Sequence, residues 1–114
     1  MYTLQIFKNQ IPYETRLEIG GGLFILKFKY NLYDERVYAD LFDLENNLLV
    51  EDEPIVLGVP LFSRYYIDIA QNIRNGFPKA LIIPDYIDSR TDKITFNNIE
   101  DVRLYVEELW EQQH

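Results

Sequence analysis

Apolar and polar residues alternate through most of the first thirty positions of the chain. The clearest run is YETRLEI at residues 13–19, where one set of alternate positions is apolar or threonine and the other set is charged. Residues 2–7 and 23–30 have the same period of two, which is typical of strands with one solvent-facing side. The glycines at 20–22 permit the positive φ angles of a tight reversal. The pattern therefore predicts three strands, the last two joined as a hairpin.

Further strands follow from the same pattern. VYADLFDL at 37–44 alternates less strictly, as expected for a strand covered on both faces. DLENN at 43–47 predicts a hairpin turn with Asp43 as its cap, because Asn tolerates the left-handed conformation that such turns need. LLV at 48–50 resumes the apolar run and the acidic EDE after it is expected to bulge out. ALIIP predicts a strand that Pro84 ends.

Two segments have mixed patterns. Residues 61–76 begin after Pro60 and end at Gly76, as helices often do, but their apolar residues form no clean stripe. One short helical turn near residues 61–65 is expected there, followed by irregular chain. Residues 102–110 group apolar side chains as a helix would and also alternate as a strand would, so both structures stay open. After Glu107 the structure is undecided.

Composition supports one all-β domain. Of the 114 residues 47% are hydrophobic, and the aromatic residues include nine Tyr and seven Phe, which favour strands and half-buried surfaces. The length fits a single core, and no linker or repeat divides the chain. No signal peptide and no apolar run long enough to span a membrane are visible, so we expect a soluble protein.

The net charge of -8 changes the expected partners. Affinity for nucleic acid comes mostly from Lys and Arg that displace counterions from phosphates, so an acidic surface argues against such a partner. The same charge suits docking onto a basic protein surface.

Side chains that commonly carry catalysis are scarce. The chain has no Cys, and its one His is His114, the last residue. Because chain ends usually fray, His114 is a poor base, and the common nucleophile–base arrangements are therefore excluded.

Carboxylates are the remaining chemical resource. Asp85, Asp88 and Asp92 share one loop, but their spacing matches no calcium loop. Asp40 and Asp43 would lie on opposite faces of their strand, which is unsuited to an acid–base pair. We therefore expect no enzymatic activity, no bound metal and no cofactor.

IVLGVPLFSRY at residues 55–65 predicts a sharp corner, because Gly58 and Pro60 interrupt an apolar run. Leu61 and Phe62 after it have two interpretations, ordinary core at a corner or contact with a partner. The candidates for a barrel-end or partner-contact role are Leu61, Phe62, Arg64, Tyr65 and Trp110.

Four segments in order carry a family resemblance: FKYN, VYADLFDLENNLL, PIVLGVPLFSRY and ALIIPDY. The set resembles the baseplate plug proteins of contractile-tailed bacteriophages and related prophages. Recurring family features are an RYN-like strand end, an acidic residue before a D-x-x-G hairpin, and a PLVLGVDLL-x-x-Y segment. They correspond to residues 29–31, to Asp40 and Asp43 with the turn at 46–47, and to residues 54–65. Pro60 departs from the pattern, since an acidic residue is frequent there, and two asparagines replace the hairpin glycine.

The resemblance implies a small, mostly antiparallel β-barrel over residues 1–107, with residues 108–114 as an extension. It favours a strand at residues 102–106, and it implies that Leu61 and Phe62 close one barrel end. The implied function is that of a structural virion protein that packs in the central hub of a phage tail baseplate or a prophage tail-like particle. Its partners would be tail hub and spike proteins, with copies in threes, and its location the virion tail, after synthesis in the host cytoplasm.

Two rival functions remain open at this point. A carbohydrate- or peptide-binding β domain would use exposed aromatic residues, including Trp110, as a platform, and it would need a concave aromatic patch with convergent polar groups. A carboxylate-dependent hydrolase would need two acids that converge in a cleft.

Overall fold

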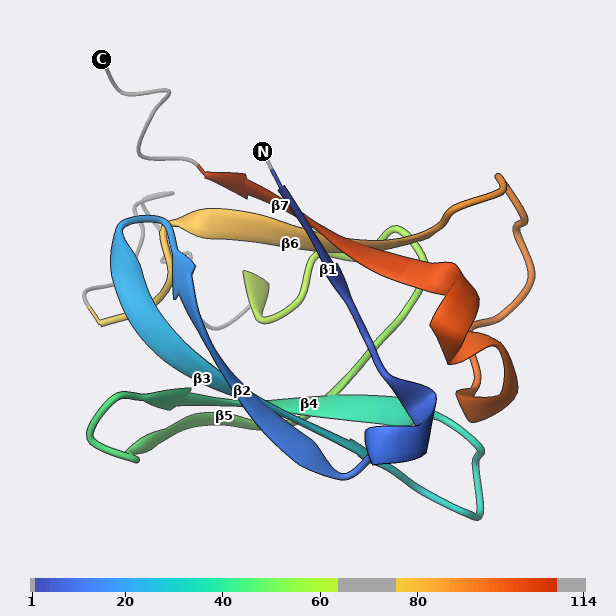
Figure 1. The fold of residues 1–114 in the computed structure, drawn as a ribbon, viewed down its shortest axis with the longest axis horizontal. Coiled ribbons are helices and arrows are strands. Elements are labelled where there is room, and N and C mark those ends of the chain that lie inside the picture. Colours follow the sequence, from blue (N-terminus) through green and yellow to red (C-terminus); the bar gives the residue numbers. More distant parts are fainter. Residues whose placement is uncertain (1, 64–75, 109–114) are drawn as a thin grey trace.

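The computed structural model describes residues 2–63 and 76–108 of the chain (Figure 1). The strands are β1 (Tyr2–Gln5), β2 (Tyr13–Ile19), β3 (Gly22–Tyr30), β4 (Val37–Asp43), β5 (Leu48–Pro54), β6 (Ala80–Tyr86) and β7 (Val102–Glu108). Two short 3-10 helices are η1 (Lys8–Gln10) and η2 (Phe96–Asp101). The predicted all-β fold is confirmed.

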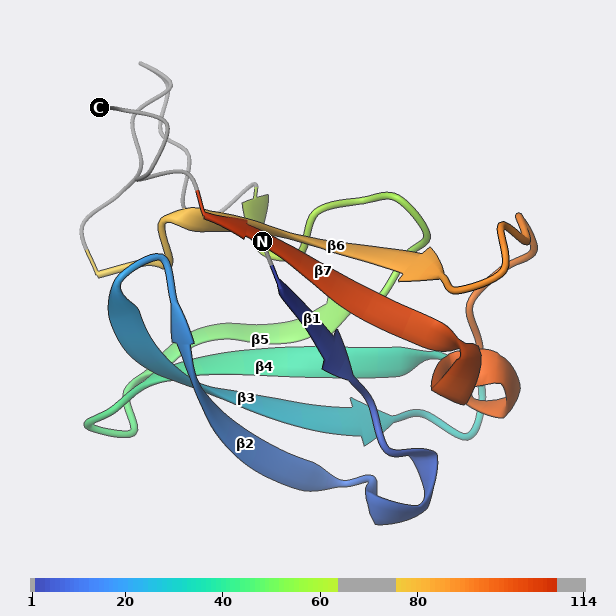
Figure 2. The ribbon, with the colours of Figure 1, turned by 45° about the horizontal axis from the view of Figure 1, so that its top comes forward.

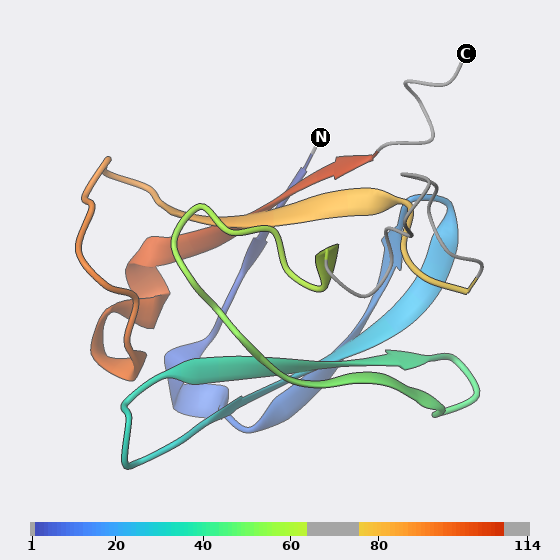
Figure 3. The same ribbon diagram turned by 180° about the vertical axis from the view of Figure 1, so that it is seen from behind.

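The strands form two antiparallel sheets that face each other across the core. One sheet has the order β1-β7-β6 and the other has the order β2-β3-β4-β5. Figures 1 and 3 show the two layers from opposite sides, with β6 and β7 in one layer and β4 and β5 in the other. Inward-facing side chains of both sheets fill the space between them. The largest fully buried side chains of the core include Phe28, Ile19, Leu26 and Leu41 from the strands, and Phe62 and Ile6 from the segments between them.

The β2–β3 hairpin forms where the alternating pattern predicted it. Ile19 pairs with Gly22, and the two residues between them, Gly20 and Gly21, have φ angles of 59° and 84°. Both angles lie in the left-handed region, which a two-residue hairpin turn of this twist needs and which glycine adopts without a steric penalty. The register that follows turns Phe24, Leu26 and Phe28 of β3 toward the core.

The β4–β5 hairpin is closed by Asp43, as predicted. Its Oδ1 accepts hydrogen bonds from the backbone N–H groups of Glu45 and Asn47, both at 2.9 Å. Asn46 has a φ of 65° at the tip. The acidic residues 51–53 lie inside β5, whose register against β4 shifts twice, and Asp52 has a φ of 59°. A bulge of this kind twists a strand and interrupts its pairing.

Closure of the sheets into a barrel is not confirmed, because the two sheets stay separate over the described residues. β1 is only four residues long, and the chain then turns away through η1. Between β1 and β2 the link is a side chain: the Tyr2 hydroxyl donates to the backbone carbonyl of Glu18. A single side-chain bond does not replace a backbone ladder, so this seam is not paired as a sheet.

The prediction that Pro84 ends its strand is wrong, since β6 continues to Tyr86. Pro84 pairs with Leu104 of β7, and its carbonyl accepts a hydrogen bond from the Gly58 N–H at 2.9 Å. Nitrogen and carbonyl of one residue point to the same side of a strand, so the proline nitrogen faces the outer edge of β6. A missing N–H at that edge does not weaken the ladder with β7.

The strand that the family resemblance favoured at residues 102–106 forms as β7, whereas periodicity alone had left helix and strand open. β7 lies between β1 and β6 and pairs with both. The segment directly before it, Phe96–Asp101, forms the short 3-10 helix η2. There the Asn98 side chain accepts the Thr95 N–H at 2.8 Å, and such local bonds compete with strand pairing. The helical turn expected near residues 61–65 lies partly outside the described residues.

Candidate functional site

The loop that joins β3 to β4, residues 31–36, is held in one shape by its own polar groups. Asn31 accepts the Tyr33 N–H on its side chain at 2.8 Å and the Glu35 N–H on its carbonyl at 2.9 Å. Asp34 accepts the Arg36 N–H at 2.9 Å and the hydroxyl of Tyr38. Bonds of this kind fix a turn without needing neighbouring secondary structure. We call this segment the 31–36 loop.

Tyr38 and Asp34 influence each other's ionisation. The hydrogen bond from the Tyr38 hydroxyl, helped by the Arg36 N–H, lowers the pKa of Asp34 below its usual value. The hydrogen bond to Asp34 raises the pKa of Tyr38 in return. Asp34 is therefore a carboxylate at neutral pH, which preserves the acceptor that shapes the loop.

A second element braces the same loop from the other side. The Phe96 N–H, at the start of η2, donates to the Glu35 carbonyl at 2.7 Å. The Phe96 ring stacks on Tyr30 with 4.2 Å between ring centroids, and the Lys8 ammonium lies 5.2 Å from the Phe96 centroid. The 31–36 loop is thus tied both to β4 and to η2.

Two apolar residues stand out of this braced loop into solvent. Tyr33 is 99% exposed and Leu32 is 76% exposed. An isolated exposed apolar residue is ordinary, but a fully exposed Tyr beside a Leu on a rigid loop is an uncommon arrangement. Rigid aromatic side chains at loop tips supply large contact area at low entropic cost when a partner binds.

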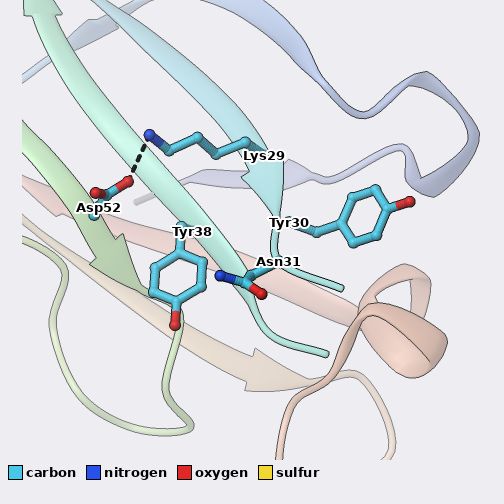
Figure 4. Close-up of a pocket in the computed structure, with 5 residues that line it drawn as sticks. All are labelled: Lys29, Tyr30, Asn31, Tyr38 and Asp52. Carbon is cyan, nitrogen blue, oxygen red and sulfur yellow. Dashed lines mark ion pairs between the residues drawn. The ribbon is translucent and has the colours of Figure 1, made fainter. Parts of the chain in front are cut away.

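A surface hollow of about 450 Å³ lies beside the loop, lined by Lys29, Tyr30, Asn31, Tyr38 and Asp52. Figure 4 shows these side chains, with Lys29 of β3 reaching across β4 toward Asp52 of β5. The Lys29 Nζ lies 2.5 Å from an Asp52 oxygen and 3.1 Å from an Asp40 oxygen. The Asp52 N–H also donates to Asp40 at 2.8 Å.

The charges in this hollow satisfy one another. Partial burial lowers the pKa of Lys29, but the carboxylates of Asp52 and Asp40 outweigh that effect, so the pKa is raised overall. Asp40 is buried, and its two oxygens are engaged by Lys29 and by the Asp52 N–H. A ligand that used the charges of Lys29 or Asp40 would therefore have to displace bonds that are already formed.

The corner segment, residues 55–63, runs from the end of β5 in one sheet to the edge of β6 in the other. The N–H groups of Gly58 and Leu61 donate to the carbonyls of Pro84 and Ile82 at 2.9 and 2.8 Å, so this segment lies along the outer edge of β6 (Figure 3). Leu61 and Phe62 are both 0% exposed. The Phe62 N–H donates to Oε2 of the buried Glu53 at 2.5 Å.

The candidate residues from the sequence are therefore distributed unevenly. Leu61 and Phe62 lie side by side in the core, whereas Arg64, Tyr65 and Trp110 lie outside the described residues. The sequence pattern did not single out Leu32 and Tyr33, because they lie in NLYDER at residues 31–36, a mostly polar turn between two predicted strands. The available signal was an apolar pair inside that turn, where solvent exposure is the usual outcome.

The carboxylates that were weighed for catalysis or metal binding each have a nearby partner of their own. Asp88 lies 2.9 Å from Arg90, whose guanidinium also contacts Asp101 at 2.7 Å. Asp92 accepts from Asn98 at 3.4 Å. Across residues 2–63 and 76–108, no group of three or more acidic or histidine side chains is arranged to hold a metal ion. The same part of the chain contains no helix long and apolar enough to cross a membrane.

The described residues form a small antiparallel β domain whose internal charges are paired and whose braced 31–36 loop presents two exposed apolar residues. Residues 1–109 match the family described as Cyanophage baseplate Pam3 plug gp18. The chain belongs to this family of phage baseplate plug proteins, and it is a structural protein of the tail baseplate. None of the curated proteins matches the chain.

Proposed function

We propose that this plug protein packs in the central hub of the baseplate through protein–protein contacts, without catalysing a reaction. Its partners are the hub and spike proteins of the tail, and three copies sit in each assembled particle. Before assembly the protein is located in the host cytoplasm. Residues 1–107 form the plug domain and residues 108–114 a C-terminal extension, in which Trp110 is a contact residue.

The observation that carries this proposal is the exposure of Leu32 and Tyr33 on a loop whose backbone is already fixed. Partners gain most from side chains that need no ordering when they dock, and Tyr is among the residues that dominate interfaces. Asp34 and Glu35 follow the pair along the chain and are exposed. The complementary surface is therefore an apolar socket with a basic rim, which the net charge of -8 also favours.

Leu61 and Phe62 have a different part in the proposed assembly. Because both are fully buried, their contribution is to hold the corner between the sheets in shape. Arg64 and Tyr65 follow directly along the chain and are proposed as partner contacts.

The test is co-purification of the plug with the hub and spike proteins from the same particle. Tyr33→Ala should leave the melting temperature unchanged, because the side chain is exposed, and should weaken hub binding by roughly 2 kcal/mol or more if it is an anchor. Ile87→Ala is the matched control: Ile87 is 56% exposed on a different loop, so its removal should change neither property. If the Tyr33→Ala variant and the Leu32→Ala variant both bind the hub as tightly as the wild type, the 31–36 loop is not the contact.

A further inference from the structure

Strand β2 is the border of the four-stranded sheet, and Figure 2 shows it outermost, with β3 on its inner side. Within the described ranges, no strand pairs with the opposite side of β2. An unpaired strand edge presents a row of backbone donors and acceptors that can template pairing with another chain.

The hairpin register tells which backbone groups face that open edge. In a two-residue hairpin the closing pair, here Ile19 and Gly22, is hydrogen-bonded, and bonded and non-bonded pairs then alternate along the strands. The peptide groups of Glu14, Arg16 and Glu18 therefore point away from β3. The hydrogen bond from the Tyr2 hydroxyl to the Glu18 carbonyl agrees with this direction and occupies that end of the edge. The backbone N–H and C=O groups of Glu14 and Arg16 remain available to pair with another strand.

The side chains on either side of Thr15 are complementary when two copies of β2 run antiparallel. If two copies of β2 pair antiparallel about a two-fold axis at Thr15, Glu14 of each copy lies opposite Arg16 of the other. Both are exposed, and no ion pair within the described chain engages either. On the inner face the same register sets Tyr13 against Leu17, and both are partly buried apolar residues packed on the core. Charge pairs form on one face and apolar pairs on the other.

A register shifted by one pair is disfavoured. With the axis at Arg16, this residue would face its own copy, and Glu14 would face Glu18. Like charges directly opposite each other destabilise an antiparallel pair, whereas opposite charges stabilise it. A further shift in the same direction, with the axis at Leu17, needs the Glu18 carbonyl, which already accepts the Tyr2 hydroxyl.

Other long edges of the fold carry protective features that β2 lacks. The outer edge of β5 is broken by the bulge at Asp52 and ends at Pro54. The edge of β6 is covered by the bonds from Gly58 and Leu61. Bulges, prolines and covering loops are the usual means by which proteins prevent edge pairing. β2 has seven residues with none of the three between Tyr13 and Ile19.

We propose that β2 forms an antiparallel strand pair with β2 of a second copy of this chain, centred on Thr15, in the free protein. The Glu14 and Arg16 peptide groups of one copy exchange hydrogen bonds with those of Arg16 and Glu14 of the other. The resulting dimer joins two four-stranded sheets edge to edge. This inference does not rest on the proposed hub contact, because it uses neither the 31–36 loop nor any phage partner.

Sedimentation velocity over a series of protein concentrations tests the proposal. The wild type should show a reversible monomer–dimer equilibrium. Glu14→Arg and Arg16→Glu each replace two opposite-charge pairs by two like-charge pairs, so each alone should weaken dimerisation about tenfold or more. Mixing the two variants restores both pairs across the interface, and a heterodimer should form. The double variant, which swaps Glu14 and Arg16 in one chain, should also dimerise.

Glu45→Arg is the matched control, because it makes the same change of net charge at an exposed turn position far along the chain from β2. It should dimerise like the wild type. Circular dichroism of every variant checks that the fold is kept. A wild type that stays monomeric at the highest concentration that remains in solution overturns the proposal. So does dimerisation of Glu14→Arg that equals that of the control, or failure of the mixed variants to associate.

Discussion

Phe62 shows how one residue links backbone conformation to core packing. Its φ of 64° lies in the left-handed region, where a bulky residue is strained. Two features hold it there: the ring is fully buried, and the N–H donates to the carboxylate of Glu53 at 2.5 Å. A hydrogen bond to a charged acceptor inside a protein is among the stronger ones. The corner is therefore held by packing and by a charge-assisted bond together.

Replacing Phe62 by Ala should lower the free energy of unfolding by roughly 3–5 kcal/mol, because a buried ring is removed from a packed core. Denaturant unfolding measures the change. Val59→Ala is the control, since Val59 lies in the same segment but is 51% exposed, and it should cost much less. Wild-type stability of the Phe62→Ala protein, combined with loss of hub binding, would instead identify Phe62 as a docking residue.

At the scale of elements, two of the short connections between strands depend on a few polar side chains. In the β4–β5 turn, hydrogen bonds from the Asn47 side chain and backbone, and from the Glu45 N–H, lower the pKa of Asp43. The bonds favour the carboxylate form, which is their acceptor. The 31–36 loop follows the same principle through Asp34. The β3–β4 and β4–β5 connections are thus specified by carboxylates that accept backbone N–H groups.

The contribution of Asp43 should disappear in acid. Its pKa in the folded state is below its unfolded value, so the stabilisation is present above the unfolded pKa and is lost as the pH falls through the folded pKa. Asp43→Asn should therefore melt below the wild type at neutral pH, and the gap should narrow as the pH is lowered through the acidic range. Asp34 and Asp88, whose pKa values are also lowered, act equally in both proteins and cancel in the comparison. Thermal melts across the pH series measure the gap, and a gap independent of pH would contradict this assignment.

At the scale of the whole molecule, several contacts between loops and strand edges join the two sheets in addition to the bond between Phe96 and the 31–36 loop. The corner segment covers the edge of β6, Tyr2 bridges to Glu18, and the β2–β3 turn touches the chain that leads into β6. At the last contact Gly20 lies so close to Lys79 that an added Cβ would be 2.5 Å from its carbonyl oxygen. The hairpin of one sheet is thereby fitted against the start of a strand in the other.

Gly20→Ala and Gly21→Ala separate this contact from backbone strain. Both residues have positive φ, so both substitutions carry the strain of the left-handed region, about 1–2 kcal/mol. Gly21 has open space around it, whereas an Ala at Gly20 must push the Lys79 backbone away. Gly20→Ala should therefore be less stable than Gly21→Ala by a further ~1–3 kcal/mol, as overpacked sites are. Equal stabilities, measured by chemical denaturation, would mean that the Lys79 backbone moves away from the added methyl group without lowering the free energy of unfolding.

Much of the fold could be predicted because alternation and turn chemistry are local signals. YETRLEI, the glycines after it, and Asp43 with its asparagines specify strands and hairpins through side-chain direction and φ preference alone. The candidate site was less accessible to prediction. The alternation that marks strands gives no information on which loop residues stand out into solvent, so it did not identify Leu32 and Tyr33 as candidates.

The sequence by itself determined the all-β character, most strand positions, the hairpin turns and, through an ordered set of segments, the resemblance to the plug family to which the chain belongs. Tertiary structure decided the rest. Pro84 continues a strand because its nitrogen faces an outer edge, and residues 102–108 form a strand because β1 and β6 supply partners on both sides. The two sheets stay separate because a tyrosine side chain, and no backbone ladder, crosses the seam between β1 and β2. These outcomes depend on contacts between residues that are far apart in the sequence, and local periodicity does not predict such contacts.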